Sequence, residues 1–288
     1  MTQATIPSPN AKEYAQREGG AANGCRCEDV QRYRDLGIYT GDTHWALFER
    51  ARDLYGDAPV AEDRSLTWSD VRHSAHKVAN LLRNLGIGKG DAVIVQLPNA
   101  AVHMEAIFGV WSIGAVPVFA LPAHGANDVA HFARTAPTGL RIAATPRDKH
   151  AKRVEKGLHE ECPELTTIQI DPRADDPWGT PVVNGTEVNA NSDTDADPPP
   201  WPETDPQALA FLQLSGGTTG TPKLIPRSHD DYLYSVRRSD EVCDMQRGDV
   251  LLVVMPASHN FTMSSPGILG ALHIGATVVY VPDPSPTT

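Results

Sequence analysis

Short apolar runs and helical patterns alternate along residues 91–122, and this alternation restricts the fold more than any other feature of the sequence. The run DAVIVQLPN (91–99) has the length and composition of a buried strand, and AAVHMEAIFGVWSIGA (100–115) is apolar on most sides of a helix. A second apolar run, VPVFALP (116–122), follows at once. Strand, helix and strand joined by short links are typical of a parallel sheet covered by helices, so we predict an α/β fold.

The same alternation continues on both sides of this region. A helix is predicted to begin after Thr67, because Thr67 and Asp70 match a capping box and an apolar stripe follows them at helical spacing. A second capped helix is predicted from Ser228, with Asp231 at the matching position. Five further apolar runs predict strands, at 140–146, 165–171, 208–214, 249–256 and 277–282.

Composition divides the chain into four parts. Residues 1–30 are rich in Ala, Gly and Asn and are expected to be a mobile extension. Residues 31–170 are predicted to form a first α/β subdomain, and residues 207–288 the start of a second. Between them, residues 171–206 hold eight prolines and nine acids with a single Arg. This composition buries little apolar surface, so an acidic, Pro-rich linker or surface excursion is expected.

Charge and composition narrow the class of partner. A net charge of -11 argues against nucleic acid, which requires a basic face. No apolar stretch has the length of a membrane span, and the amino terminus lacks the apolar core of a signal peptide, so a cytoplasmic protein is expected. The four cysteines show no spacing typical of a metal site, so none is predicted: Cys25, Cys27, Cys162 and Cys243.

The stretch LQLSGGTTGTPKLIPRSHDDY (212–232) is the most informative for function. A Gly-, Ser- and Thr-rich loop between a predicted strand and a later helix lets successive backbone N–H groups converge on an anion, and Lys223 adds a positive charge. The loop is not a Walker A motif, because Pro222 precedes the lysine and Leu224 follows it. It also lacks the Rossmann pattern of glycines. A flexible surface loop without a ligand is the remaining alternative.

This stretch resembles the signature loop of the adenylate-forming enzymes, which activate a carboxylate with ATP and Mg²⁺ and release pyrophosphate. The resemblance implies that the ATP phosphates are bound by Ser215, Gly216, Gly217, Thr218, Thr219, Gly220 and Lys223. It also implies that the chain forms the amino-terminal part of the large α/β domain of such an enzyme.

A second stretch, MPASHNFTMSSPGILGALHIGATVVYVPDPSP (255–286), is similar to the siderophore-type 2,3-dihydroxybenzoate and salicylate AMP ligases within that superfamily. The resemblance implies that His259 lies near the substrate carboxylate and that Phe261 packs beside the aromatic ring. It further implies that Asn260 and Ser265 bond the ring hydroxyl ortho to the carboxylate. Spacing by itself favours the alternative that His259 and Asn260 merely satisfy a strand end, and the resemblance reverses this preference.

The resemblance covers about half the length of a complete family member. The adenine and ribose motifs and the carboxy-terminal domain with the family's catalytic lysine are not found, so a truncated chain is expected and its catalytic residue is unknown. The full enzyme would pass the aryl group to the phosphopantetheine thiol of an aryl carrier protein. Two alternatives remain: an acyl- or aryl-CoA synthetase, and a non-catalytic half that needs a partner chain.

Overall fold

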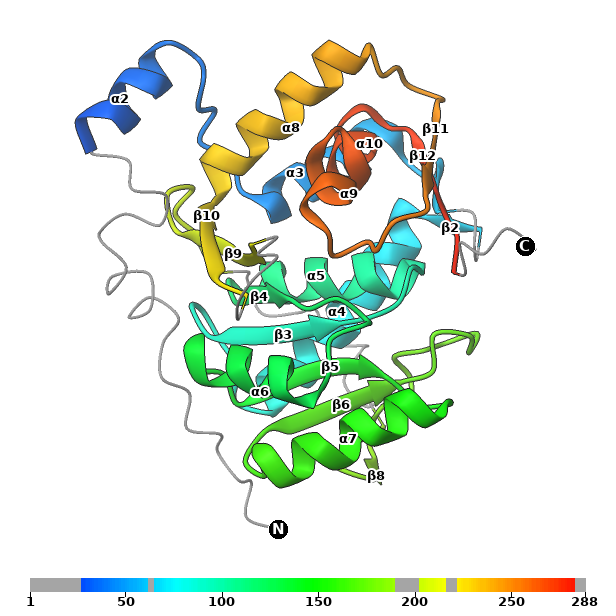
Figure 1. Ribbon diagram of the computed structural model, residues 1–288. Helices are drawn as coiled ribbons and strands as arrows, with labels where there is room; N and C mark the ends of the chain where they lie inside the picture. Colours follow the sequence, from blue (N-terminus) through cyan, green and yellow to red (C-terminus); the bar gives the residue numbers. More distant parts are fainter. Residues whose placement is uncertain (1–26, 62–64, 190–201, 216–221, 283–288) are drawn as a thin grey trace.

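The computed structural model describes residues 27–61, 65–189, 202–215 and 222–282, and its largest feature is an eight-stranded sheet (Figure 1). The strand order is β10-β9-β4-β3-β5-β6-β7-β8. The five strands from β9 to β6 in this order run parallel, as predicted for an α/β fold. The strands are β3 (Ala92–Gln96), β4 (Val116–Phe119), β5 (Leu140–Ala144), β6 (Thr166–Ile170), β7 (Val182–Val183), β8 (Thr186–Glu187), β9 (Leu209–Leu214) and β10 (Leu224–Ser228).

Two pairs of helices cover the two faces of this sheet. Alternate residues of β3 face opposite ways, so Val93 and Val95 join one apolar core while Ala92 and Ile94 join another. The first core contains α4 (Trp68–Asn84) and α5 (Ala101–Ser112), and the second contains α6 (Ala126–Thr135) and α7 (Lys149–Glu161). This arrangement explains why the apolar run of β3 is continuous rather than alternating.

The predicted helix after Thr67 is confirmed as α4. The Thr67 hydroxyl accepts a hydrogen bond from the Asp70 N–H at 3.2 Å, and the Asp70 carboxylate accepts one from the Thr67 N–H at 2.9 Å. Both partners of the capping box are therefore satisfied. The predicted stripe packs inward, with Val71, Ala75 and Val78 almost inaccessible to solvent.

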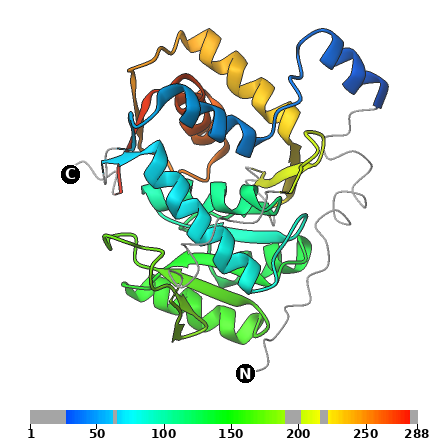
Figure 2. The same cartoon turned by 180° about the vertical axis from the view of Figure 1, so that it is seen from behind.

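A smaller four-stranded sheet lies on the other side of α4 and α5 (Figures 1 and 2). Its order is β11-β12-β1-β2, with β12 parallel to both of its neighbours. Its strands are β1 (Pro59–Ala61), β2 (Leu66–Thr67), β11 (Val250–Val253) and β12 (Thr277–Tyr280). The remaining helices are α2 (Cys27–Asp35), α3 (His44–Tyr55), α8 (His229–Cys243), α9 (Asn260–Ser264) and α10 (Gly267–Ile274).

The division between the two sheets differs from the predicted subdomain boundaries. Strand β9, expected to open the second subdomain, pairs with β4 of the large sheet, and β1 pairs with β12 across most of the chain. Parallel sheets join strands that are distant in sequence, and hydrophobic periodicity carries no information about which strands pair.

The segment 171–189 is part of the fold and not the solvated linker that its composition suggested. Strands β7 and β8 form a hairpin on the edge of the large sheet, turning at Asn184 and Gly185, both with positive φ. Trp178 is completely buried and donates a hydrogen bond from its indole nitrogen to the Glu105 carboxylate at 2.8 Å. Residues 190–201 of the predicted linker lie outside the described residues.

The predicted amino-terminal extension, residues 1–30, is described only from residue 27. The helix α2 begins there, at Cys27, so the last residues of the predicted extension are helical.

None of the helices in the described ranges has the length and apolar character needed to cross a membrane.

A close contact between α4 and α5 yields a stability prediction. A Cβ atom on Gly109 of α5 would lie 2.5 Å from Cβ of Val78 and 2.9 Å from the Ala75 carbonyl oxygen. Gly109→Ala should therefore push the two helices apart and destabilise the chain by about 1–3 kcal/mol in urea unfolding. Gly88→Ala is the matched control, because a Cβ there meets no atom within 4 Å. Equal stability of the two variants would contradict a role for this close contact in stability.

Candidate functional site

The glycine-rich loop connects two antiparallel strands. Residues 215–223 join β9 to β10, and the base of this hairpin is closed by two hydrogen bonds. The Ser215 N–H donates to the Lys223 carbonyl oxygen at 2.9 Å, and the Lys223 N–H donates to the Ser215 hydroxyl oxygen at 3.0 Å. The other loop residues predicted to bind phosphate lie outside the described residues: Gly216, Gly217, Thr218, Thr219 and Gly220.

The strand β10 was missed by the sequence prediction, which passed from the loop directly to the helix at Ser228. Pro226 lies inside β10, and a proline within a short run argues against a strand. Here β10 is the outermost strand of the sheet, where a missing N–H costs no ladder hydrogen bond. The predicted cap itself is present, because the Ser228 hydroxyl accepts from the Asp231 N–H at 3.4 Å.

Both described ends of the loop keep groups that can bind an anion. The Lys223 side chain is exposed. The Ser215 hydroxyl oxygen accepts from the Lys223 N–H and donates to no other group among the described residues, so its proton can be offered to an anion.

The residues predicted to bind the aryl acid surround the short helix α9. His259 is its N-cap residue and accepts a hydrogen bond at Nδ1 from the Phe261 N–H at 3.2 Å, which leaves Nε2 facing away from this contact. Asn260 is exposed and its side-chain oxygen accepts a hydrogen bond from the Tyr232 hydroxyl at 3.1 Å. Ser265 ends the helix as its C-cap residue.

Phe261 and Ser265 line one pocket of about 210 Å³, which His259 and Asn260 do not line. The rest of its wall comes from the strand β11, the residues after it, Thr262 and Gly267. Phe261 is 57% exposed, so its ring is available on the side that faces away from the core. The structure thus brings the four predicted aryl-acid residues to one helix but only two of them to this cavity.

Buried polar side chains connect the aryl-acid residues to the phosphate loop. Gln213 lies in β9, two residues before Ser215, and donates a hydrogen bond to the Ser258 carbonyl oxygen at 2.8 Å. Ser258 immediately precedes His259, and its hydroxyl lies 3.2 Å from Nε2 of the buried His103 in α5. The end of β9 and the start of α9 are therefore held side by side.

Asn99 holds the connection between β11 and α9 from the other side. Its side-chain nitrogen lies within hydrogen-bond distance of the carbonyl oxygens of Val253, Val254 and Met255, with the Met255 contact at 3.0 Å. Its side-chain oxygen accepts from the Ala257 N–H at 2.8 Å. One amide thus fixes the backbone of the segment that leads to His259.

The sequence prediction missed Gln213, His103, Asn99 and Tyr232. The signal that could have found Gln213 is a single amide within the apolar strand LAFLQL, since a buried polar group requires a partner. Burial also determines the ionisation of two of these groups. It lowers the pKa of His103 to about 4 and raises that of Tyr232 to about 12, so both side chains are neutral at pH 7.

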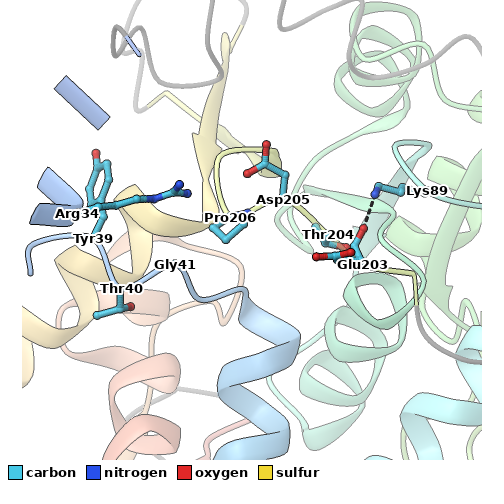
Figure 3. A pocket seen from close by; sticks show the side chains of 9 residues that line it. All are labelled: Arg34, Tyr39, Thr40, Gly41, Lys89, Glu203, Thr204, Asp205 and Pro206. Atoms are coloured by element: carbon cyan, nitrogen blue, oxygen red, sulfur yellow. Dashed lines mark hydrogen bonds between the residues drawn. The ribbon is translucent and has the colours of Figure 1, made fainter. Parts of the chain in front are cut away.

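A larger cavity of about 800 Å³ contains none of the predicted site residues. Figure 3 shows Arg34 and Tyr39 from the amino-terminal segment on one side and Glu203, Thr204 and Asp205 on the other, with Lys89 hydrogen-bonded to the Glu203 carbonyl oxygen. The side chains that line this cavity include both positively and negatively charged groups. Within the described ranges, no group of three or more His, Cys, Asp or Glu side chains is arranged to hold a metal ion.

The fold is that of the adenylate-forming enzymes, as a solved relative demonstrates. The apo structure of MbtA from Mycobacterium smegmatis superposes with a TM-score of 0.77 at 35% sequence identity, covering 91% of this chain and 48% of MbtA. The chain belongs to the AMP-binding enzyme family, whose pattern it matches over residues 48–288.

Two curated relatives are similar over nearly the same range. The salicyl-AMP ligase / salicyl-S-ArCP synthetase of Mycobacterium tuberculosis is 37% identical over 262 residues, which are 88% of this chain and 45% of the relative. The 2,3-dihydroxybenzoate-AMP ligase of Bacillus subtilis is 36% identical over 262 residues, 90% of this chain and 47% of the relative. The chain therefore spans about half the length of the curated relatives it matches.

Proposed function

We propose that this chain supplies the ATP-phosphate and aryl-acid residues of a cytoplasmic enzyme that converts salicylate or 2,3-dihydroxybenzoate to its aryl-AMP for siderophore synthesis. The observation that carries the proposal is the hydrogen bond from Gln213 to Ser258, because it joins the base of the phosphate loop to the residue before His259. The names of the two curated relatives supply the substrate class.

The proposed reaction has a simple chemical logic. An oxygen of the aryl carboxylate attacks the α-phosphorus of ATP, and the bond from that phosphorus to the oxygen bridging to the β-phosphate breaks. Pyrophosphate leaves with increased negative charge, which Lys223 and the donors of residues 215–220 would stabilise. Mg²⁺ would arrive bound to the ATP phosphates and neutralise part of this charge. The aryl group would then pass to the phosphopantetheine thiol of a carrier protein.

His259 and Asn260 would bind the acid at the start of α9. The histidine ring is oriented by the Phe261 N–H, and Asn260 by Tyr232. A site that provides a hydrogen bond to a ring hydroxyl loses affinity for analogues without that hydroxyl. Discrimination against benzoate is therefore the expected signature of this site.

The test is aryl-acid-dependent exchange of labelled pyrophosphate into ATP. The chain is joined to the second half of the Mycobacterium tuberculosis relative, and the unjoined chain is assayed beside it. Exchange by the joined protein is expected with salicylate or 2,3-dihydroxybenzoate and not with benzoate. Equal rates with benzoate would contradict the proposed substrate class.

Two variants connect this exchange to residues of the chain itself. Lys223→Ala removes a cation from the loop and should slow exchange about a hundredfold. Lys152→Ala changes an exposed lysine of α7 and should leave the rate unchanged. Offering the loaded enzyme a carrier-protein thiol or coenzyme A then decides between a carrier-loading ligase and an aryl-CoA synthetase.

A further inference from the structure

The two ends of the Asn260 side-chain amide have different surroundings. The oxygen accepts a hydrogen bond from the Tyr232 hydroxyl at 3.1 Å, and the same hydroxyl lies 3.4 Å from the Asn260 carbonyl oxygen. Within the described part of the chain, the amide nitrogen donates no hydrogen bond to the protein, and Asn260 is exposed. The amide therefore directs its oxygen toward Tyr232 and leaves its NH₂ group available to a ligand.

Tyr232 is held firmly in place. Its side chain is completely buried, its ring meets that of Phe211 edge to face with centroids 4.5 Å apart, and the Arg227 guanidinium lies 4.8 Å from its centroid. The Tyr232 hydroxyl can both donate and accept: it lies within hydrogen-bond distance of two oxygens of Asn260, and the Ser264 side chain hydrogen-bonds it as well. With Ser264 donating to the phenol oxygen, the single phenol proton is directed at Asn260. Amide oxygen and nitrogen are nearly equal in shape, so without this donor the amide could turn over.

We infer that Tyr232 is a positioning residue that makes Asn260 a hydrogen-bond donor, so that the site selects aromatic acids carrying an acceptor ortho to the carboxylate. The inference rests on the proposed function, in which Asn260 contacts the ortho substituent. It adds the direction of that hydrogen bond and the residue that sets it.

Salicylate and 2-aminobenzoate distinguish the two possible directions of the hydrogen bond between Asn260 and the ortho group of the acid. In salicylate, the phenolic O–H donates to the adjacent carboxylate, so oxygen lone pairs face outward and can accept from the Asn260 NH₂ group. In 2-aminobenzoate, one N–H donates to the carboxylate and the other faces outward. Two donors then oppose each other, and neither gains a partner.

The experiment is calorimetric titration of the 288-residue chain with each acid. The unaltered chain is expected to bind salicylate about tenfold or more tightly than 2-aminobenzoate, the effect of one unmatched polar pair. In Tyr232→Phe the ratio should fall to within about threefold, since the freed amide can turn to accept from the amino group. The control Tyr234→Phe alters a more exposed tyrosine of the same helix and should keep the original ratio.

A second variant tests the same geometry without altering the core. Asn260→Asp replaces the outward donor with an acceptor at an exposed position, so the preference should reverse toward 2-aminobenzoate although both acids bind more weakly. An unchanged ratio in Tyr232→Phe or in Asn260→Asp would overturn the inference and leave the proposed function standing. If neither acid binds the unaltered chain, the proposed aryl-acid site fails and the inference fails with it.

Discussion

Lowering the pH from 7 to 5 should remove several kcal/mol of folding stability, because three histidines are buried in their neutral form. Burial lowers the pKa of His103 to about 4 and that of His229 to about 3. The pKa of His44 is also well below its ordinary value, first because of burial and then because of the nearby His229 and Arg227. His44 and His229 lie in contact, with their Nδ1 atoms 2.7 Å apart.

The sign of the effect follows from the protons bound in each state. Below about pH 6.5 the unfolded chain protonates these histidines while the folded chain does not, so stability falls as the pH falls. The loss approaches about 1.4 kcal/mol per pH unit for each histidine, and three together approach about 4 kcal/mol per unit. Carboxylates, with ordinary pKa values near 4, contribute mainly below this window.

Urea unfolding at several pH values between 7 and 5 measures this slope. His103→Gln cannot titrate and should lower the slope by up to about 1.4 kcal/mol per pH unit, whereas His159→Gln, at an exposed position of α7, should leave the slope unchanged. An unfolding free energy that stays constant over this range would refute the prediction.

Trp178→Ala should destabilise the chain by about 3–5 kcal/mol, as expected for removing a completely buried tryptophan. The substitution leaves a cavity and also withdraws the indole N–H from the buried Glu105 carboxylate. The effect would be large for a segment whose composition suggested a solvated linker.

Urea unfolding of two further variants separates the contributions. Trp178→Phe keeps most of the ring volume and loses the hydrogen bond, so its loss should be smaller than that of Trp178→Ala. Val242→Ala, at a position 79% exposed, should stay within about 0.5 kcal/mol of the unaltered chain. A loss below about 1 kcal/mol in Trp178→Ala would show that residues 171–189 contribute little to the fold.

The parts of the fold that local patterns determine could be predicted from the sequence. The helix α4 carries its own start signal in Thr67 and Asp70, and β3 and β4 are short apolar runs with clear ends. The burial of Trp178 depends on Glu105, 73 residues away, and no local pattern contains that contact. Strand β10 was missed because it contains Pro226. A sheet accommodates such a proline in an edge strand, and β10 lies at the edge.

Prediction of the site from the sequence has the same limit, because local patterns do not contain contacts between distant residues. His259 and Asn260 could be named from a motif because they are contiguous in the sequence. Tyr232 and Gln213 act through partners 28 and 45 residues away, so their roles become visible only once the chain is folded. Asn99 is separated by more than 150 residues from the carbonyl groups that it binds after β11.

The pairing of β1 with β12 determines the order in which the two sheets can form while the chain is synthesised on the ribosome. The Thr277 hydroxyl donates to the Pro59 carbonyl oxygen across 218 residues, and Ala61 pairs with Val278. At a synthesis rate of about 5–20 residues per second, β1 waits on the order of 10–40 seconds for its parallel partner. The large sheet acquires its parallel strands β3 to β6 well before that moment, so it can serve as the platform on which the small sheet later closes.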